Sequence, residues 1–228
     1  MNIPDITIAV DGCSSTGKSS FAKLLSSRLG FLYLDSGALY RGVTLFAREE
    51  GLIDAENVVS PSLKERIQGL DFHFGEGNAL FLADRLIEKE IRSMEVSGQV
   101  SPVSALQYVR NFVDDILHRL AAGGRVIMDG RDIGVTVFPD AELKIFMTAS
   151  EEVRARRRFN ELLSKGETPA YEDVLANIRE RDYIDSHRVA SPLRCAEDAF
   201  VLDNSDMTLE EEVCWALGVI RGKLGILK

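Results

Sequence analysis

A glycine-rich run carries the clearest chemistry in this chain. The ten residues Asp11–Ser20 read Asp-Gly-Cys-Ser-Ser-Thr-Gly-Lys-Ser-Ser, and the apolar run Ile6–Val10 precedes them. Glycine, four further residues and then Gly-Lys-Ser is the spacing of a phosphate-binding loop between a strand and a helix. Such a loop points backbone N–H groups at phosphates, while Lys18 adds positive charge and Ser19 or Ser20 offers a hydroxyl to magnesium. The alternative, a glycine-rich turn formed by chance, does not account for the flanking strand and helix.

A second group of polar side chains follows the apolar run Arg125–Met128. Asp129, Arg131 and Asp132 come directly after this run. In a parallel α/β sheet the carboxyl end of such a strand lies beside the phosphate loop, and an aspartate there commonly serves the magnesium shell. The alternative is a capped turn held by an Asp–Arg pair. The functional interpretation therefore depends on the neighbouring loop.

Arginine is concentrated in one short segment of an otherwise acidic chain. The formal net charge is −9, yet Arg154, Arg156, Arg157 and Arg158 place four positive charges within five residues. Arg154, Arg157 and Arg158 share one face of a predicted helix. That face indicates either a basic surface or a lid that closes over phosphates, where it would supply positive charge and exclude water.

A row of charged residues lies on a later predicted helix. Arg181, Asp185 and Arg188 are spaced i, i+4 and i+7, which predicts that they share one helical face. The row could be a solvated stripe of salt bridges, or it could bind a sugar diol together with a phosphate or a base. The pattern alone leaves both interpretations open.

The order of the elements predicts an α/β fold with a parallel sheet. Five short, nearly continuous apolar runs indicate buried strands at Ile6–Val10, Phe31–Leu34, Arg125–Met128, Leu143–Met147 and Phe200–Leu202. Helical patterns run from Lys18 to a Gly30 cap, from about Ser36 to Gly51, and from a Ser101-Pro102 start to Gly123-Gly124. Strands that alternate with helices predict a sheet whose ligands lie beyond the carboxyl ends of its strands.

One region, from about 61 to 100, interrupts this alternation. Leu70–Phe74 and Ala79–Leu82 predict two strands joined by a glycine turn. The polar run Glu88–Arg92 follows and has the composition of a mobile segment. Because the region is too short for a core of its own, we expect a small insert within one domain that spans 1–228.

Composition narrows the class of protein further. An acidic chain lacks the basic field that broad nucleic-acid binding needs, so we expect no nucleic-acid partner. No apolar run is long enough to cross a bilayer and no signal-like segment precedes the first strand, so we expect a cytoplasmic protein with no membrane partner. Cys13, Cys195 and Cys214 form neither a disulfide framework nor a zinc pattern, and we expect no metal ligands of the zinc type.

Four longer motifs resemble those of bacterial cytidylate kinases, and the resemblance covers essentially the whole chain. They are Asp35-Ser36-Gly37-Ala38-Leu39-Tyr40-Arg41, Asp129-Gly130-Arg131-Asp132-Ile133-Gly134, Phe138-Pro139-Asp140-Ala141, and the segment from Arg181-Asp182 through Asp185-Ser186 to Arg188. The resemblance implies a P-loop nucleoside monophosphate kinase. Its five-stranded parallel sheet would be flanked by helices, with a nucleoside-monophosphate-binding insert at about 61–100 and a short lid at about 154–170.

The same resemblance implies a reaction. The loop would bind ATP together with its Mg²⁺, a second pocket would bind CMP or dCMP, and reversible transfer of the terminal phosphate would give ADP and CDP or dCDP. The attacking phosphate oxygen is already anionic near neutral pH, so positioning and charge neutralisation would suffice without a strong general base. We expect the enzyme to be a monomer.

The family's residue roles carry over to matching positions of this chain. The resemblance places Ser36, Arg110, Asp132 and Arg188 on the pyrimidine, Ser101, Arg181 and Asp185 on the sugar, and Arg41 and Arg131 on the monophosphate. The ATP-binding residues would be Gly12, Cys13, Ser14, Ser15, Thr16, Gly17, Lys18, Ser19 and Ser20. The residues implied in catalysis are Lys18, Arg131, Asp132, Arg154, Arg157 and Arg158.

The loop itself departs from the family pattern. Cys13 stands where these kinases usually carry proline, and Ser20 where they carry threonine. Ser15 and Ser19 stand where they carry glycine. A serine at position 15 restricts a backbone that glycine would leave free, so we expect altered ATP affinity rather than lost activity. Two adjacent hydroxyls leave open which one meets Mg²⁺.

Two other classes of protein share such a loop. A P-loop switch such as a GTPase would need a guanine-selecting Asn-Lys-x-Asp motif, and the chain has none. Another small-molecule kinase on the same scaffold could act on shikimate, AMP or thymidylate. The insert and the row of Arg181, Asp185 and Arg188 argue against shikimate, which offers neither base nor ribose.

Overall fold

The computed structural model describes residues 4–224, so the ends of the predicted 1–228 domain, residues 1–3 and 225–228, lie outside the described part. The chain forms two compact units. The first contains Met1–Tyr33, Gly124–His187 and Ser191–Lys228, and the second contains Leu34–Gly123 and Arg188–Ala190. Residues 61–100 therefore belong to the second unit, and residues 154–170 belong to the first.

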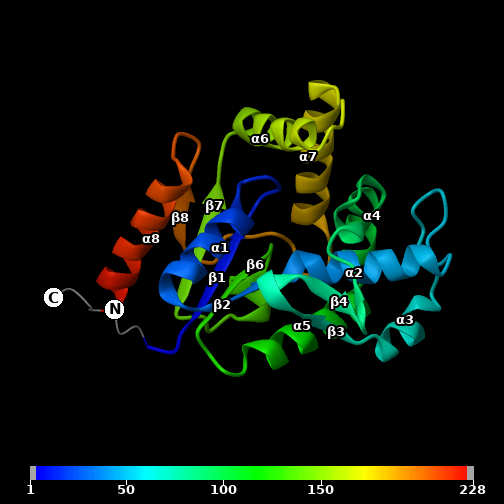
Figure 1. Cartoon of the computed structure of the whole chain (residues 1–228), viewed down its shortest axis with the longest axis horizontal. Helices are drawn as coiled ribbons and strands as arrows, with labels where there is room; N and C mark the ends of the chain where they lie inside the picture. The colour runs from blue at the N-terminus through cyan, green and yellow to red at the C-terminus, as the bar shows by residue number, and fades with distance from the viewer. Residues whose placement is uncertain (1–3, 225–228) are drawn as a thin grey trace. The chain divides into compact units, whose positions relative to one another are not determined.

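A five-stranded sheet confirms the predicted α/β fold class (Figure 1). Its strand order is β2-β6-β1-β7-β8, with β1 parallel to β6 and β7, and β7 parallel to β8. The strands are β1 Thr7–Gly12, β2 Leu32–Asp35, β6 Val126–Asp129, β7 Leu143–Thr148 and β8 Phe200–Asp203. Each overlaps its predicted apolar run. Strands β1, β6 and β7 are largely buried, as a continuous apolar sequence predicts, whereas Phe200 and Val201 of β8 are exposed.

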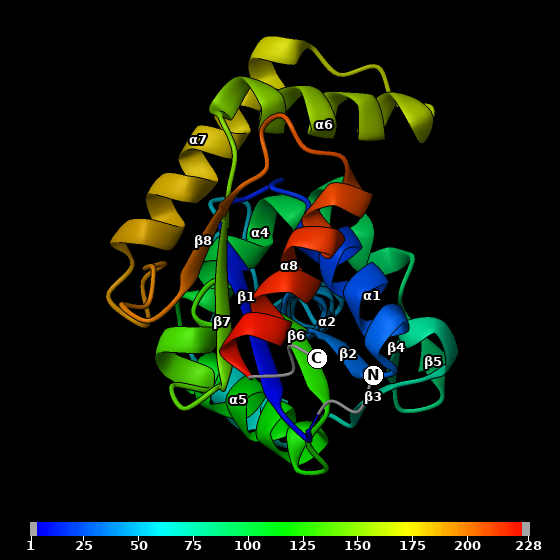
Figure 2. The same cartoon turned by 90° about the vertical axis from the view of Figure 1, so that its left-hand side faces the viewer.

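Two helices of the first unit, α1 (Lys18–Leu29) and α8 (Leu209–Lys223), pack together against the sheet (Figure 2). Their buried faces join the apolar side chains of the strands in a single core. As predicted, α1 ends at Gly30, which adopts the left-handed conformation that terminates many helices. Helix α8 begins with a capping box, in which the Thr208 hydroxyl and the Glu211 carboxylate satisfy each other's backbone N–H groups.

Helices α6 (Glu151–Ser164) and α7 (Tyr171–His187) also belong to the first unit and pack against each other. Helix α7 ends at His187, so Arg188 lies one residue beyond it. The prediction that Arg188 shares a helical face with Arg181 and Asp185 is therefore wrong, whereas those two residues do lie on α7. The chain turns soon afterwards, since Ser191 has a φ of 47° and precedes a proline. A residue before proline is biased away from the helical conformation, which the charge spacing alone does not reveal.

The second unit combines helices with a small antiparallel sheet. Its elements are α2 Ser36–Glu49, α3 Leu63–Arg66, β3 Phe72–Phe74, β4 Leu80–Leu82, β5 Arg85–Leu86, α4 Met94–Ser104 and α5 Gln107–Ala121. Strands β3 and β4 form the predicted hairpin, and β5 adds a third strand. Gly42 allows α2 to approach this sheet closely, since a Cβ there would lie 2.7 Å from the Phe72 ring.

The helix predicted to start at Ser101 starts earlier. Ser101 and Pro102 lie inside α4, and Leu106, whose backbone is extended, separates α4 from α5. The hydroxyl that caps α4 belongs to Ser93, which accepts a hydrogen bond from the Val96 N–H. Val96 is fully buried, so packing stabilises the helical turns that precede Ser101, whereas the sequence around Pro102 locally resembles a helix start.

The run Glu88–Arg92 is held by burial and ion pairs, contrary to the mobile segment that its composition predicts. Ile91 has no exposed surface. The Arg92 guanidinium lies 2.8 Å from the Asp35 carboxylate and 2.9 Å from the Glu88 carboxylate. One apolar residue in a polar run therefore anchors the segment.

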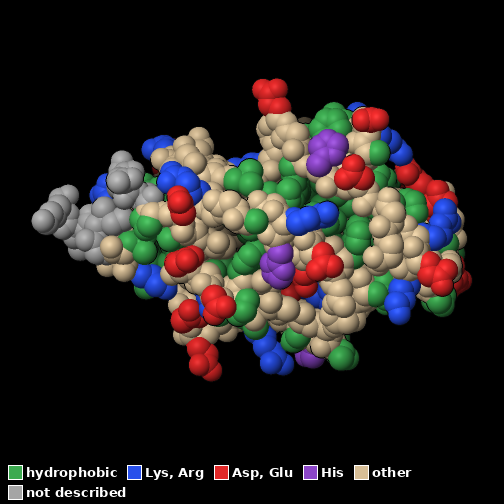
Figure 3. All heavy atoms as spheres, turned by 90° about the horizontal axis from the view of Figure 1, so that it is seen from below, with side chains coloured by type: hydrophobic (Ala, Val, Ile, Leu, Met, Phe, Trp, Pro, Cys, Tyr) green, Lys and Arg blue, Asp and Glu red, His purple; other side chains and the backbone are tan. Residues whose placement is uncertain are grey.

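The surface carries charges of both signs. On the face drawn in Figure 3, acidic and basic side chains are interspersed. All three cysteines are free thiols. Within residues 4–224, no helix combines the length and the apolar character that spanning a membrane requires.

Gly12, the last residue of β1, permits a close approach between β1 and β7. Its φ is 147°, and a Cβ at this position would lie 2.0 Å from the Met147 carbonyl oxygen. The strand therefore turns into the loop at a point where no side chain fits.

We expect the substitution Gly12→Ala to lower the free energy of unfolding by about 3 kcal/mol or more, because the new methyl group overlaps the β7 backbone and strains φ. Thermal and urea unfolding would measure the loss. The matched control is Gly218→Ala in α8, where a Cβ meets no atom within 4 Å. That change should stabilise the helix by about 0.5–1 kcal/mol. Equal stability of the two variants would contradict the close approach.

Candidate active site

The predicted phosphate loop connects the carboxyl end of β1 to the N-terminus of α1. Gly17 caps α1 with a φ of 95°, and Ser15 also has a positive φ, 59°. The loop ends at the positive pole of the helix dipole, where an anion is stabilised. Ser15 therefore occupies a conformation that glycine adopts at lower cost, and the altered ATP affinity expected from it stays a prediction.

Lys18 folds back over the loop. Its Nζ donates to the Cys13 carbonyl at 2.6 Å and to the Thr16 hydroxyl at 3.3 Å. Burial lowers the pKa of the Lys18 ammonium to about 7; Arg131 adds to this effect and Asp129 opposes it. A cation is thus held within the loop by neutral oxygen atoms, and an anion that enters the loop would find it close by.

A hydroxyl and a carboxylate meet beside the loop. The Ser19 hydroxyl donates to Asp129 Oδ2 at 2.8 Å, and the Tyr33 hydroxyl donates to Asp129 Oδ1 at 2.7 Å. Within residues 4–224, the neighbouring Ser20 is exposed, and it is Ser19 that contacts Asp129. Oxygen donors are the ligands that Mg²⁺ prefers, and it usually keeps several waters beside one or two protein groups. Ser19 and Asp129 therefore fit a magnesium ion carried by a nucleotide.

In the described part of the chain, acidic, histidine and cysteine side chains do not form a metal site of their own. Residues 4–224 contain no group of three or more such side chains placed to hold an ion. Any magnesium at Ser19 and Asp129 would therefore depend on phosphate oxygens and water for its remaining ligands.

Asp11 ties the end of β1 to the segment that follows β6. Its two carboxylate oxygens accept hydrogen bonds from the backbone N–H groups of Ile133 at 2.8 Å and Gly134 at 2.7 Å. Asp132 directly precedes these residues and is itself buried. Burial raises the pKa of Asp11 to about 6, although the two N–H donors oppose the rise. The sequence offered only one signal for this role, an aspartate at a strand end.

An ion pair from α6 and α7 holds the peptide groups of Ser14. Asp182 Oδ1 accepts from the Ser14 N–H at 2.9 Å, while Arg154 Nη1 donates to the Ser14 carbonyl at 3.1 Å. Arg154 and Asp182 are also paired with each other. Arg131 Nη2 donates to the Ser14 hydroxyl at 3.0 Å. Asp182 was absent from the predicted site residues, and no spacing rule in the sequence would have selected it.

Arg131 links the loop to a residue of the predicted sugar-binding set. Its Nε lies 2.8 Å from Asp185 Oδ2, and both side chains are largely buried. Arg181, from the same set, is half-buried on α7. The structure therefore brings Arg131 and Asp185 together, and it places Asp132 and Arg181 in the same compact unit.

The three arginines predicted to form a basic helical face have different partners. Arg157 Nη1 donates to the Thr16 carbonyl at 3.1 Å, so it reaches the loop as Arg154 does. Arg158 instead pairs with Glu161 of its own helix at 2.9 Å. Two of the three arginines thus contact the loop, and the third forms an ion pair within α6.

Five of the predicted substrate-binding residues lie in the second unit: Ser36, Arg41, Ser101, Arg110 and Arg188. Ser36 opens α2, and the preceding Asp35 caps that helix by accepting from the Ala38 N–H. Burial alone would raise the pKa of the Asp35 carboxyl, but the Arg92 and Arg41 guanidiniums hold it below its ordinary value. Ser101 is buried within α4.

Arg110 is the most unusual of these residues, because it is fully buried. Its guanidinium lies 5.2 Å from the centre of the Tyr40 ring, and its Nη1 donates to the Ser104 carbonyl at 3.1 Å. Burying a charge without partners is expensive. A ring face and a carbonyl oxygen offset part of this cost.

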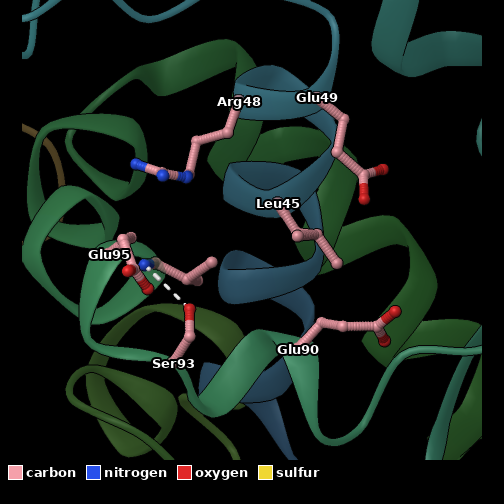
Figure 4. A pocket seen from close by; sticks show the side chains of 7 residues that line it. Leu45, Arg48, Glu49, Glu90, Ser93 and Glu95 are labelled. Carbon is pink, nitrogen blue, oxygen red and sulfur yellow. Dashed lines mark hydrogen bonds between the residues drawn. The ribbon is translucent and has the colours of Figure 1, made fainter.

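A surface hollow of about 370 Å³ also lies in the second unit, between α2 and the start of α4 (Figure 4). Its lining residues are Leu45, Arg48, Glu49, Glu90, Ser93, Glu95 and Val96. Glu49 and Glu90 are already paired with Arg85. None of the lining residues is among the site residues predicted from the sequence, although those from Glu90 to Val96 lie within the predicted insert at about 61–100.

A strand that leads through this loop into a helix, with a lysine inside the loop, defines a P-loop nucleotide-binding protein of the α/β class. Two solved structures share the fold. An uncharacterized protein from Eubacterium ventriosum has a TM-score of 0.54 at 9% identity and covers 96% of this chain and 99% of its own. A Thermus thermophilus protein has a TM-score of 0.51 at 20% identity and covers 98% of each chain.

Sequence comparison identifies the family. The cytidylate kinase family model matches residues 8–221. The cytidylate kinase of Parabacteroides distasonis is 49% identical over 218 residues, which cover 93% of this chain and 95% of that protein. The cytidylate kinase of Flavobacterium johnsoniae is 46% identical over 220 residues, covering 94% of this chain and 96% of that protein. The chain belongs to the cytidylate kinase family.

We expect the substitution Ser15→Gly to raise the free energy of unfolding by about 0.5–1 kcal/mol, because it removes the strain of a positive φ. Thermal unfolding would measure the gain. The control is Ser27→Gly, at an exposed position within α1, which should lose a similar amount. If both variants lose stability, Ser15 is not strained.

Asp11 should make stability depend on pH. Its pKa is about 6 in the folded chain and 3.8 as the ordinary value, so the folded state binds the extra proton and stability falls as pH rises from 4 to 6. We expect the stability advantage of the wild type over Asp11→Asn to be larger at pH 5 than at pH 8, by about 1.4 kcal/mol, because pH 5 lies one unit below the folded pKa and above the unfolded one. Urea unfolding at both pH values would measure it. An advantage that is constant, or that grows with pH, would contradict this assignment.

Proposed function

We propose that this protein transfers the terminal phosphate of ATP to CMP or dCMP, giving ADP and CDP or dCDP. The proposal rests above all on Lys18, which is buried inside a loop of phosphate-binding sequence beside the Ser19–Asp129 pair. Membership of the cytidylate kinase family supports the choice of acceptor. The alternatives, a GTPase-like switch or a kinase for another small molecule, gain no support from these relatives.

The donor half of the proposal assigns the nucleotide phosphates to the loop. Residues 12–20 would bind ATP, with N–H groups and the α1 terminus facing the phosphates. Lys18 would place its charge on the transferred group, which favours the bound anion at any pH where the ammonium is protonated. Magnesium bound to the nucleotide would neutralise charge that develops on the phosphate oxygens, and Ser19 and Asp129 would hold it.

The acceptor half follows the residue roles implied by the family resemblance. Ser36, Arg110, Asp132 and Arg188 would contact the pyrimidine, Ser101, Arg181 and Asp185 the sugar, and Arg41 and Arg131 the monophosphate. The Arg131–Asp185 pair supports this grouping, because it links a proposed phosphate contact to a proposed sugar contact. Arg110 would bring a fully buried guanidinium to the acceptor contacts.

Catalysis would depend on position and charge rather than on a general base. The attacking oxygen of a monophosphate is anionic near neutral pH, so its nucleophilicity needs no proton removal. Lys18, Arg131 and Asp132 would orient the reacting groups. Arg154, Arg157 and Arg158 would act from a lid at about 154–170. The nucleoside-monophosphate-binding insert at about 61–100, a monomeric state and a cytoplasmic location without a nucleic-acid partner remain predictions from the sequence.

We expect the purified protein to form ADP rapidly with CMP or dCMP, and slowly with UMP, AMP or shikimate. A coupled assay of ADP release across these five acceptors would measure the preference. Lys18→Ala should lower kcat at least 100-fold, because it removes the charge on the transferred phosphate. The control Lys64→Ala changes an exposed lysine on α3 and should leave turnover intact.

Two results would contradict this proposal. One is a clear preference for an acceptor other than CMP or dCMP. The other is full turnover by the Lys18→Ala variant, which would show that the loop does not serve phosphate transfer.

A further inference from the structure

Asn204, the residue that follows β8, contacts the phosphate loop from outside. Its side chain is fully buried. Its Nδ2 donates to the Thr16 carbonyl at 2.8 Å and to Glu212 Oε1 at 2.7 Å, and its Oδ1 accepts from Arg157 Nη1 at 3.1 Å. Both amide hydrogens and the amide oxygen are thus used, which fixes the orientation of the side chain.

The Thr16 carbonyl is the part of the loop that receives this contact. It accepts from Asn204 Nδ2 and also from Arg157 Nη1 at 3.1 Å. A trans peptide is planar, so its C=O and the N–H of the next residue point in opposite directions. Two donors that hold the Thr16 carbonyl outward therefore turn the Gly17 N–H toward the inner side of the loop.

The orientation of the Gly17 peptide group depends on contacts from outside the loop. Its φ of 95° lies in a region where glycine moves freely, so the residue does not fix its own peptide orientation. A Cβ at this position would lie 3.8 Å from Asn204 Nδ2, which shows how closely the amide follows the loop backbone. The loop geometry at Gly17 is thus set by its neighbours.

Glu212 of α8 completes the arrangement. Only 4% of this residue is exposed, and its Oε2 accepts no hydrogen bond within residues 4–224. Burial raises the pKa of the Glu212 carboxyl, against the opposing effects of Asn204 and Arg157. A buried carboxylate oxygen without a partner destabilises a fold. Its other oxygen orients the Asn204 amide, and this contact gives Glu212 a function at that position.

We propose that Asn204 is a positioning residue for the nucleotide phosphates: it holds the Thr16–Gly17 peptide so that the Gly17 N–H faces them, and Glu212 orients the Asn204 amide. The inference rests on the proposed function in one respect, that the loop binds ATP. It adds an element, the end of β8, that neither the loop pattern nor the family motifs include.

The first test compares Asn204→Ala with the wild type by calorimetric titration of ATP and by steady-state kinetics. We expect the dissociation constant and the KM for ATP to rise about tenfold, as the loss of one hydrogen bond and of the peptide orientation would cause. The KM for CMP should stay within twofold. The matched control is Asn177→Ala, an exposed asparagine on α7 and outside the proposed lid, which should change neither constant.

A second pair of variants separates positioning from simple stability. Glu212→Gln keeps an oxygen that accepts from Asn204, so ATP binding should stay within twofold of the wild type. Glu212→Leu removes the acceptor but fills the space, and should weaken ATP about threefold with little change in Tm. This pair also keeps the test valid if Asn204→Ala folds poorly.

Equal increases in the KM for ATP and for CMP, or a fall in Tm with unchanged ATP affinity, would overturn the proposal, because Asn204 would then serve the fold alone. Indistinguishable ATP affinities of Glu212→Gln and Glu212→Leu would overturn the part assigned to Glu212. Failure of the proposed function is a separate result. If the wild type binds ATP but does not phosphorylate CMP, the calorimetric comparison still decides the role of Asn204.

Discussion

The loop after β1 depends on hydrogen bonds to its backbone from charged and polar side chains elsewhere in the fold. A buried turn needs partners for its peptide groups, since unpaired backbone N–H and C=O groups are costly. Here the Ser14 peptide groups are held by the Arg154–Asp182 pair, and the Thr16 carbonyl by Arg157 and Asn204. The loop is therefore shaped by α6, α7 and the end of β8 as much as by its own glycines.

Three buried charges near the loop have neutral partners that offset the cost of burial. Asp11 accepts two backbone N–H bonds, Asp129 accepts two hydroxyls, and Lys18 donates to a carbonyl and a hydroxyl. These partners are neutral, so they stabilise the charges without cancelling them. A site of this kind keeps its electrostatic field available for a charged ligand.

The sequence predicts those helices, strands and site residues that are determined by nearby residues in the chain. The five strands and the Gly30 cap of α1 follow from local patterns, whereas the start of α4 was missed because burial of Val96, not the Ser101-Pro102 pair, sets the helix boundary. Among the site residues, Lys18 and Asp129 come from a motif and a strand end. The loop contacts of Asp182 and Asn204 could not be predicted, although Asp182 lies in a family motif, because their partners are 168 and 188 positions away in the chain.

Ser15 has an unusual backbone conformation within the phosphate loop. With a φ of 59°, the residue has the backbone shape expected of a glycine but carries a side chain. Because α6, α7 and the end of β8 hold the loop backbone, the loop keeps this shape although serine at position 15 adopts it at a higher cost than glycine would. A phosphate loop held in this way keeps a glycine-like backbone shape where its sequence has serine, because contacts outside the loop offset the cost of that shape.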